Sequence, residues 1–213
     1  MKLRSDSFDD FGAIPEQFAF AATDDFNHIK LSGNRNPHLS WDDPLRSTRS
    51  YTIICHDPDV PSIADDVNRE GRVIQASLPR IIFYHWVMFD IPADTREILS
   101  GSQSSAVTAG GKPGPAAPGG FRHGLNDYSN WFRADPDMSG EYYGYDGPCP
   151  PWNDELLHRY VFTIYALDIA RLDVTGKVTG GAVLEAMTGH ILDAASITGV
   201  YTLNPDLLLE REP

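Results

Sequence analysis

The chain has 213 residues, of which 41% are hydrophobic and 22% are charged, a composition typical of a folded globular domain. Acidic residues outnumber basic residues by 30 to 17, and the net charge of −13 disfavours binding to nucleic acid and to anionic membrane surfaces. We therefore expect one domain over residues 1–213 with no nucleic-acid partner.

The first 50 residues predict short strands and turns, because they are rich in Pro, Asn and Asp and hold only small apolar islands at 18–20 and 29–31. The charged start, Met1 to Asp6, has no apolar stretch behind it, and no apolar run in the chain is long enough to span a bilayer. We therefore expect no signal peptide, no integral membrane association and a cytoplasmic location.

The first strong strand is predicted at residues 51–55, which are aromatic and β-branched and are followed by Asp57 and Pro58. Because proline cannot continue the hydrogen-bond ladder, Asp57 should lie at a strand exit and face a cleft. Residues 62–80 read as a loop with a short strand around residues 72–74. The apolar run at 81–91, which contains His85, predicts a central strand buried on both faces.

The second half of the chain adds two strands and one helix. Residues 101–120 are rich in Gly, Ser, Pro and Ala and predict a flexible surface loop. Residues 158–167 alternate as a central strand, which places His158 and Tyr160 on the same face. A helix is expected at 181–189 with Gly189 as its C-cap, and a last strand at 197–203.

Three separated segments concentrate polar groups beside these strands. They are Asp57-Pro58-Asp59-Val60-Pro61, then His85 within its strand, then the segment that runs from Gly147 through Pro150-Pro151 to His158-Arg159-Tyr160. In this order they resemble the phosphatidylethanolamine-binding protein family, which includes the Raf kinase inhibitor proteins and their bacterial relatives. The stretch from Asn36 to Trp41 also resembles that family, and residues 124–128, 144–147 and 189–201 resemble its bacterial branch.

The resemblance implies a mainly β fold, an antiparallel Greek-key β-sandwich with a short C-terminal helix. It also implies a non-enzymatic protein without a cofactor or metal, which binds a small anion, a phosphorylated small molecule or a phospholipid headgroup. A regulatory role through a protein partner and a homodimer follow from the same resemblance. The implied ligand-binding residues are Asp57, Asp59, Pro61, His85, Gly147, Pro150, Pro151, His158 and Tyr160.

These residue types suit an anion, because histidine N–H groups and a tyrosine O–H are hydrogen-bond donors. If Asp57 lies within a few ångströms of His85 or His158, it should raise the pKa of that histidine and keep it charged. Asp154 and Glu155 should bring two carboxylates to the pocket mouth, where they would weaken anion binding. Cys55 and Cys149 are expected to be reduced thiols near the pocket.

Two other classes of function stay open. Asp57, His85 and His158 could form a two-histidine, one-carboxylate metal site or serve another hydrolase, although no short ligand spacing and no G-x-S-x-G motif is present. The chain could also be a protein-interaction module without a ligand. Taken singly, each of the two histidines is more often a core residue, and Asp57 is more often a turn former before proline.

Overall fold

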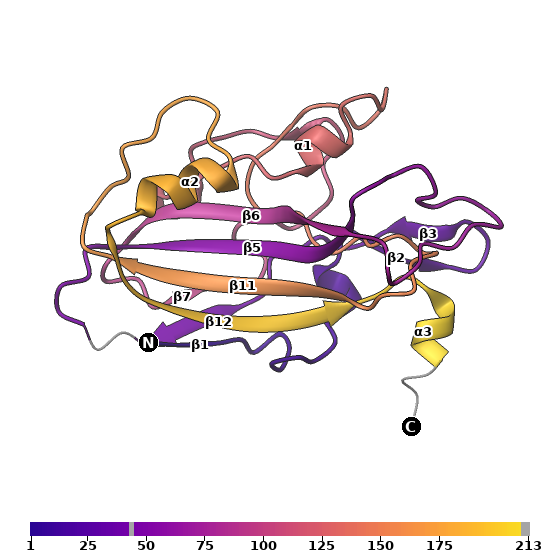
Figure 1. Ribbon diagram of the computed structural model, residues 1–213. Coiled ribbons are helices and arrows are strands. Elements are labelled where there is room, and N and C mark those ends of the chain that lie inside the picture. The colour runs from indigo at the N-terminus through magenta and orange to yellow at the C-terminus, as the bar shows by residue number, and fades with distance from the viewer. Residues whose placement is uncertain (43–44, 210–213) are drawn as a thin grey trace.

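The computed structural model describes residues 1–42 and 45–209 and centres on a twisted five-stranded sheet (Figure 1). Its strands lie in the order β12 (Ile191–Tyr201), β11 (His158–Leu167), β5 (Ser50–Pro61), β6 (Arg80–Pro92) and β9 (Arg122–His123). All neighbours in this sheet are antiparallel. The long strands β5, β6 and β11 therefore lie side by side in its middle.

A smaller antiparallel sheet packs on one face of the large sheet and completes the sandwich. It consists of β1 (Lys2–Arg4), β4 (Leu39–Asp42) and β7 (Glu97–Ile98). The hairpin of β2 (Ala21–Asp24) and β3 (His28–Leu31) stands at one end of the large sheet (Figure 1). A short parallel pair joins β8 (Gly111–Lys112) to β10 (Glu141–Tyr142). The predicted mainly β, antiparallel sandwich is confirmed.

The helices are short, and none in the described part of the chain is long and apolar enough to cross a membrane. The helix α2 (Gly180–Met187) covers the face of the large sheet opposite the small sheet (Figure 1). Two further α-helices, α1 (Tyr128–Trp131) and α3 (Pro205–Leu209), and two 3₁₀ turns, at Glu16–Phe18 and Pro118–Gly120, were not expected from the sequence. Each has at most five residues, which is too short for a periodic apolar pattern to be recognised.

The predicted late helix is present, with slightly different ends. The Thr179 side chain caps its N-terminus by accepting a hydrogen bond from the Ala182 N–H. Its C-cap is Thr188 rather than Gly189, which follows at a φ of 85°. Glycine takes this left-handed conformation without strain, so Gly189 turns the chain into β12.

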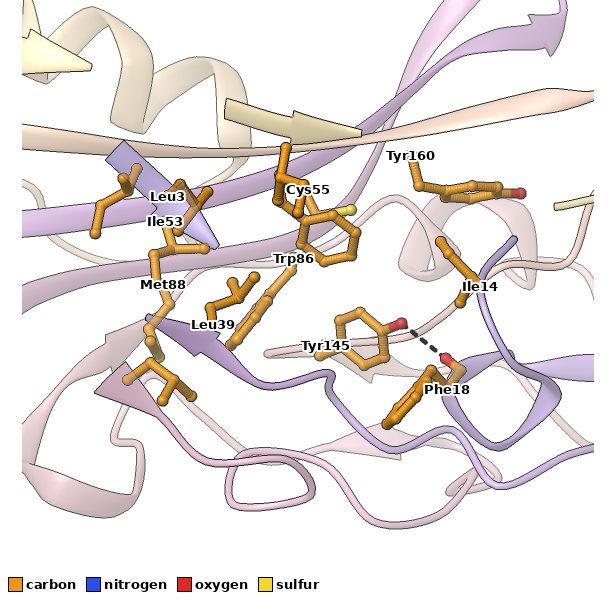
Figure 2. Close-up of a cluster of buried hydrophobic side chains, with 14 of the residues drawn as sticks. Leu3, Ile14, Phe18, Leu39, Ile53, Cys55, Trp86, Met88, Tyr145 and Tyr160 are labelled. Atoms are coloured by element: carbon orange, nitrogen blue, oxygen red, sulfur yellow. Dashed lines mark hydrogen bonds between the residues drawn. The ribbon is translucent and has the colours of Figure 1, made fainter. Parts of the chain in front are cut away.

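The main core lies between the two sheets (Figure 2). Leu39 of β4 faces Ile53, Trp86 and Met88 of the large sheet, and all four side chains are fully buried. The Tyr145 hydroxyl is satisfied within this core, since it donates a hydrogen bond of 2.7 Å to the carbonyl oxygen of Phe18. The packing therefore fixes the N-terminal segment against the strands that carry the candidate site.

Three predicted strands differ from those observed. β5 does not stop at Asp57 but runs on to Pro61, because its register with β6 shifts between Asp57 and Val60. Pro58 falls in this irregularity, where no ladder hydrogen bond is required of it. The strand expected at residues 72–74 is wrong, since Ile74 forms only an isolated bridge to Asp154. β12 starts at Ile191, six residues before the predicted strand at 197–203.

Two predictions about exposure were also wrong. The first half of β6 is not buried on both faces, since Ile81 is 50% exposed and β9 pairs with β6 only at Met88 and Phe89. The segment 101–120 is not a free surface loop, because β8 lies within it and the Lys112 side chain reaches the buried carboxylate of Asp146. A charged pair rather than apolar packing attaches this segment to the protein. Its low content of apolar residues therefore did not reveal the attachment.

Met187→Ala tests the packing of α2 on the sheet. Met187 is fully buried against the cluster that includes Val87 and Leu167, so the smaller side chain should lower the free energy of unfolding by about 2–5 kcal/mol. The control Glu185→Ala changes an exposed position of the same helix and should alter stability by less than about 0.5 kcal/mol. Urea unfolding followed by circular dichroism measures both, and similar losses for the two variants would contradict this packing.

Candidate functional site

A cavity of about 440 Å³ is lined by residues of the β2–β3 hairpin, of α1 and of the strands β5, β6 and β11. Most of its wall is apolar, with polar groups confined to a few positions. The lining residues are Phe20, Ala21, Ile29, Lys30, Leu31, Asp57, Val60, Pro61, Val67, Asn68, Phe83, His85, Tyr128, Trp131, Phe132, Met138, Cys149, Pro150, Pro151, His158 and Tyr160.

The cavity brings together most of the residues that the sequence singled out. Those that line it are Asp57, Pro61, His85, Pro150, Pro151, His158 and Tyr160. Asp59 and Gly147 do not line it. Asp59 accepts three hydrogen bonds from Arg159, through the backbone N–H, Nε and Nη2 at 2.8–3.0 Å. Gly147 lies so close to the backbone of Phe18 that a Cβ would approach the Phe18 carbonyl oxygen to 2.1 Å, so its role here is close packing.

His158 is held between two carboxylates at the inner end of the cavity. Its Nδ1 lies 2.7 Å from Asp57 Oδ2 and its Nε2 lies 3.2 Å from Asp154 Oδ2. Burial disfavours the charged ring, but Asp57 and Asp154 outweigh it and raise the pKa of His158 to about 9. The predicted effect of Asp57 on a histidine is therefore present, and both N–H groups of His158 are already used.

His85 is in the opposite state. Its Nδ1 lies 2.8 Å from the backbone carbonyl oxygen of Asp146, which can only accept a hydrogen bond. Burial lowers the pKa of His85 to about 4, although Asp57 and the Asp146 carbonyl act in the other direction. His85 is therefore a neutral imidazole at pH 7, and of the two histidines it is His158 that Asp57 keeps charged.

Two tyrosines flank His85 in edge-to-face contact, and only one of them has its hydroxyl satisfied. The Tyr128 hydroxyl donates a hydrogen bond of 2.8 Å to the Gly147 carbonyl oxygen. The Tyr160 hydroxyl is buried and has no hydrogen-bond partner among the described residues. The rings of Tyr160 and His85 lie 5.0 Å apart. Burial, together with nearby Asp57, raises the pKa of Tyr160, so its O–H group stays protonated.

The charges around the inner end of the cavity occur in neutralising pairs. Arg80 Nη1 and Nη2 donate to the two oxygens of Asp154 at 2.5 and 3.0 Å, and Asp57 pairs with His158. Asp154 is thus buried behind His158 rather than exposed at the mouth, which corrects its predicted position. Glu155 accepts a hydrogen bond from the Ala76 backbone and does not line the cavity.

The sequence reasoning missed the apolar wall and one lining tyrosine. Phe20, Ile29 and Leu31 come from the apolar islands that had been read as short strands and turns, and Val67 comes from a predicted loop. The helix α1 and its neighbouring residues supply Tyr128, Trp131, Phe132 and Met138. For the part of the wall around α1, the signal in the sequence was the density of aromatic residues between 121 and 145. Both cysteines are free; Cys149 lines the cavity, where burial raises its pKa to about 12, whereas Cys55 lies in the main core.

The predicted alternative of a metal site does not fit the donor set. The ring nitrogens of His158 both carry protons shared with carboxylates, and His85 Nδ1 is bound to a carbonyl oxygen. A metal ligand must offer a free lone pair, which leaves only one histidine nitrogen of this group. Within residues 1–42 and 45–209, no group of three His, Cys, Asp or Glu side chains is placed to hold a metal ion.

Comparisons with known proteins relate the chain as a whole to one family. The family model described as phosphatidylethanolamine-binding protein matches residues 4–202. The UPF0098 protein YbhB of Escherichia coli is 32% identical over 203 residues, which cover 95% of this chain and all of that protein. A UPF0098 protein of Methanothermobacter thermautotrophicus is 34% identical over 201 residues, covering 94% of this chain and 98% of that protein.

Solved structures agree with the fold. The crystal structure of a putative phosphatidylethanolamine-binding protein homologue from Chlamydia trachomatis superposes with a TM-score of 0.59 at 26% identity, covering 94% of this chain and 95% of that one. The crystal structure of Escherichia coli YbcL, described as a new member of the mammalian PEBP family, superposes with a TM-score of 0.66 at 22% identity. The superposition covers 94% of this chain and 97% of that one.

The raised pKa of His158 predicts a stability that depends on pH. Because the folded pKa lies above the unfolded value of about 6.5, the contribution of about 3 kcal/mol is fully present below pH 6.5 and is lost as the pH rises through 9. The unfolding free energy of the wild type should therefore fall over this range. His158→Gln should be less stable at pH 6 and should lose this part of the fall.

His190→Gln is the matched control, because His190 also pairs with an aspartate, Asp168, but on the surface. This variant should keep the slope of the wild type. Denaturant unfolding at pH 6, 7.5 and 9 measures all three proteins. An unchanged slope in His158→Gln would show that His158 is not held as an imidazolium.

Proposed function

The chain belongs to the phosphatidylethanolamine-binding protein family, and we propose that it binds a small phosphorylated ligand in the cavity beside His85 and Tyr160. The ligand is a phosphorylated small molecule or a phospholipid headgroup, and its anionic head would lie at the inner end. Regulation of a protein partner and formation of a homodimer are further parts of this proposal and rest on the family resemblance alone.

The observation that carries the proposal is the unpartnered hydroxyl of Tyr160. A buried donor without a partner costs about 1–3 kcal/mol, and an oxygen of a bound head would remove this cost. Because the pKa of Tyr160 is raised, the group remains a donor at neutral pH. A phosphoryl oxygen is a strong acceptor for such a donor.

The shape and the apolar wall of the cavity support a small organic ligand. Its volume of about 440 Å³ lies within the usual range for small-molecule sites, which combine apolar walls with a few polar groups. Residues such as Phe20, Leu31 and Phe132 would cover the less polar part of the ligand. Lys30, the lysine on the cavity wall, would add a positive charge near the outer part.

We propose binding rather than catalysis, because the groups that could act as base or nucleophile are engaged or weak; His85, whose pKa burial lowers to about 4, is a weak base. His158 has a pKa of about 9 and is already protonated at neutral pH, so it cannot accept a further proton there. Asp57 accepts hydrogen bonds from His158 and from the Asp59 backbone N–H. Burial keeps Cys149 as a thiol, which is a weak nucleophile.

Tyr160→Phe tests the proposal. The variant removes one hydroxyl and no packing, so the affinity for phosphate and phosphoethanolamine should fall about tenfold, as expected for one lost hydrogen bond. Titrations followed by ³¹P and ¹H–¹⁵N NMR give the dissociation constants. Tyr165→Phe, which removes a hydroxyl from the opposite face of β11, should bind as the wild type does.

Equal affinity of Tyr160→Phe and the wild type would show that the Tyr160 hydroxyl does not bind the ligand. The absence of any saturable shift at millimolar ligand would refute the binding proposal and favour a module that contacts other proteins without a ligand.

A further inference from the structure

We propose that the cavity selects a head that donates a hydrogen bond as well as accepting one, and that a bound phosphoryl group is therefore its monoprotonated form. This inference rests on the proposed function and specifies its ligand. It follows from counting which polar atoms of the inner end are already used and which are left.

The backbone partner of His85 fixes the tautomer of its ring. The Asp146 carbonyl oxygen, 2.8 Å from Nδ1, has no proton to give, so Nδ1 carries the single proton of the neutral ring. Nε2 is then left with a lone pair. Within the described ranges the ring's one hydrogen bond of ordinary geometry is that of Nδ1; the Gly147 backbone, next to Asp146, also acts on the ring and raises its pKa. His85 lines the cavity. The side chain therefore offers an acceptor, not a donor, to a ligand.

The arrangement of His85 and Asp146 is held rigidly. Asp146 and His85 bind each other twice, because the Asp146 backbone N–H also donates to the His85 carbonyl oxygen at 3.0 Å. The buried Asp146 side chain is fixed in turn by Asn34 at 2.7 Å and by Lys112 and Asn126, both at 2.8 Å. Lys112 comes from the segment 101–120, so this segment acts as a positioning element for the tautomer.

The other groups at the inner end are engaged. Both N–H groups of His158 donate hydrogen bonds to carboxylates, and the Tyr128 O–H donates to the Gly147 carbonyl oxygen. Among the side-chain groups described there, the Tyr160 O–H and the weakly donating Cys149 S–H are left as donors, and His85 Nε2 and the spare lone pairs of Asp57 as acceptors. The rings of Tyr160 and His85 are 5.0 Å apart, close enough for one head group to contact both.

A phosphomonoester meets this requirement in one protonation state. Its monoanion has an O–H for His85 Nε2 and oxygens for the Tyr160 O–H. The dianion, which prevails above the second pKa of about 6, would direct an oxygen lone pair at the lone pair of Nε2. A phosphodiester without a further donor would also direct an oxygen lone pair at His85 Nε2. An ammonium group beside the phosphate is a second source of an N–H donor for this nitrogen.

The two histidines of the inner end keep their charge states between pH 5 and 8. The titratable group next to His85 is Asp146, whose pKa is raised by burial, while Lys112, Asn34 and Asn126 act in the other direction. His85 stays neutral above its pKa of about 4, and His158 stays charged below its pKa of about 9. Burial raises the pKa values of Tyr128, Tyr160 and Cys149. The other charged groups that face the site are Asp57 of β5, Asp154 and, farther out, Lys30 of β3.

The first experiment measures the tautomer directly. Long-range ¹H–¹⁵N correlation of the histidine rings at pH 6.5 should give His85 a protonated Nδ1 and an unprotonated Nε2. Lys112→Met, which removes one support of Asp146, should increase exchange between the two tautomers. A protonated Nε2 in the wild type would overturn the inference without affecting the proposal that a phosphorylated ligand binds.

The second experiment measures the affinity for methyl phosphate at pH 5 and pH 8 by calorimetry. The monoanion fraction falls nearly 100-fold over this range for a second pKa of about 6, so the affinity should fall at least tenfold. Dimethyl phosphate should bind weakly at both pH values. Glycerophosphoethanolamine, whose ammonium supplies the donor, should bind with little pH dependence.

Two variants separate the origins of the pH effect. His28→Gln removes an exposed histidine that stacks on Trp152, beside Pro151 of the cavity wall, and should leave the fall in methyl phosphate affinity unchanged. His85→Leu should bind methyl phosphate weakly and equally at both pH values. Its folding is checked by the spectrum of the core amides, and His85→Asn replaces it if that spectrum is lost.

The outcomes are distinct. Equal affinity for methyl phosphate at pH 5 and 8, or tight binding of dimethyl phosphate, would overturn the donor requirement while the proposed function stands. If none of the three probes binds, the proposed function falls and this inference falls with it. A fall with pH that is absent from His85→Leu supports both.

Discussion

The ion pair between Asp57 and His158 joins β5 to β11 at the end of the sheet where the cavity opens. Both side chains are almost completely buried, and a buried charge is tolerated only when it is paired and hydrogen-bonded. Asp154 and Arg80 extend the pair into a chain of alternating charges. The ends of these strands, and the cavity wall between them, depend on this chain of partners.

The two histidines of the cavity show how neighbouring groups decide the chemistry of one residue type. His158 faces two carboxylates and is held as a cation, whereas His85 faces a backbone carbonyl in an apolar setting and is held neutral. The charged His158 is fully engaged in ion pairs within the fold. The neutral ring of His85 is the one that keeps a free nitrogen at the cavity wall.

The fold was largely predictable because its main strands carry strong local patterns. The strand β11 has the predicted bounds, His158–Leu167, and the middle of β6 is buried as expected. The cavity wall was not predictable in this way. Phe20 and Phe132 come from short elements whose apolar residues are too few to show a period, and they reach the site through tertiary packing.

The sequence by itself determined the class of fold, the family and most of the polar residues of the cavity, because alternation along strands and linear motifs are local properties. Only the tertiary structure decided what those residues do. Asp154 and Lys112 lie far along the chain from the groups they neutralise, Arg80 and Asp146. A protonation state depends on distances between such groups, and the order of residues along the chain does not contain those distances.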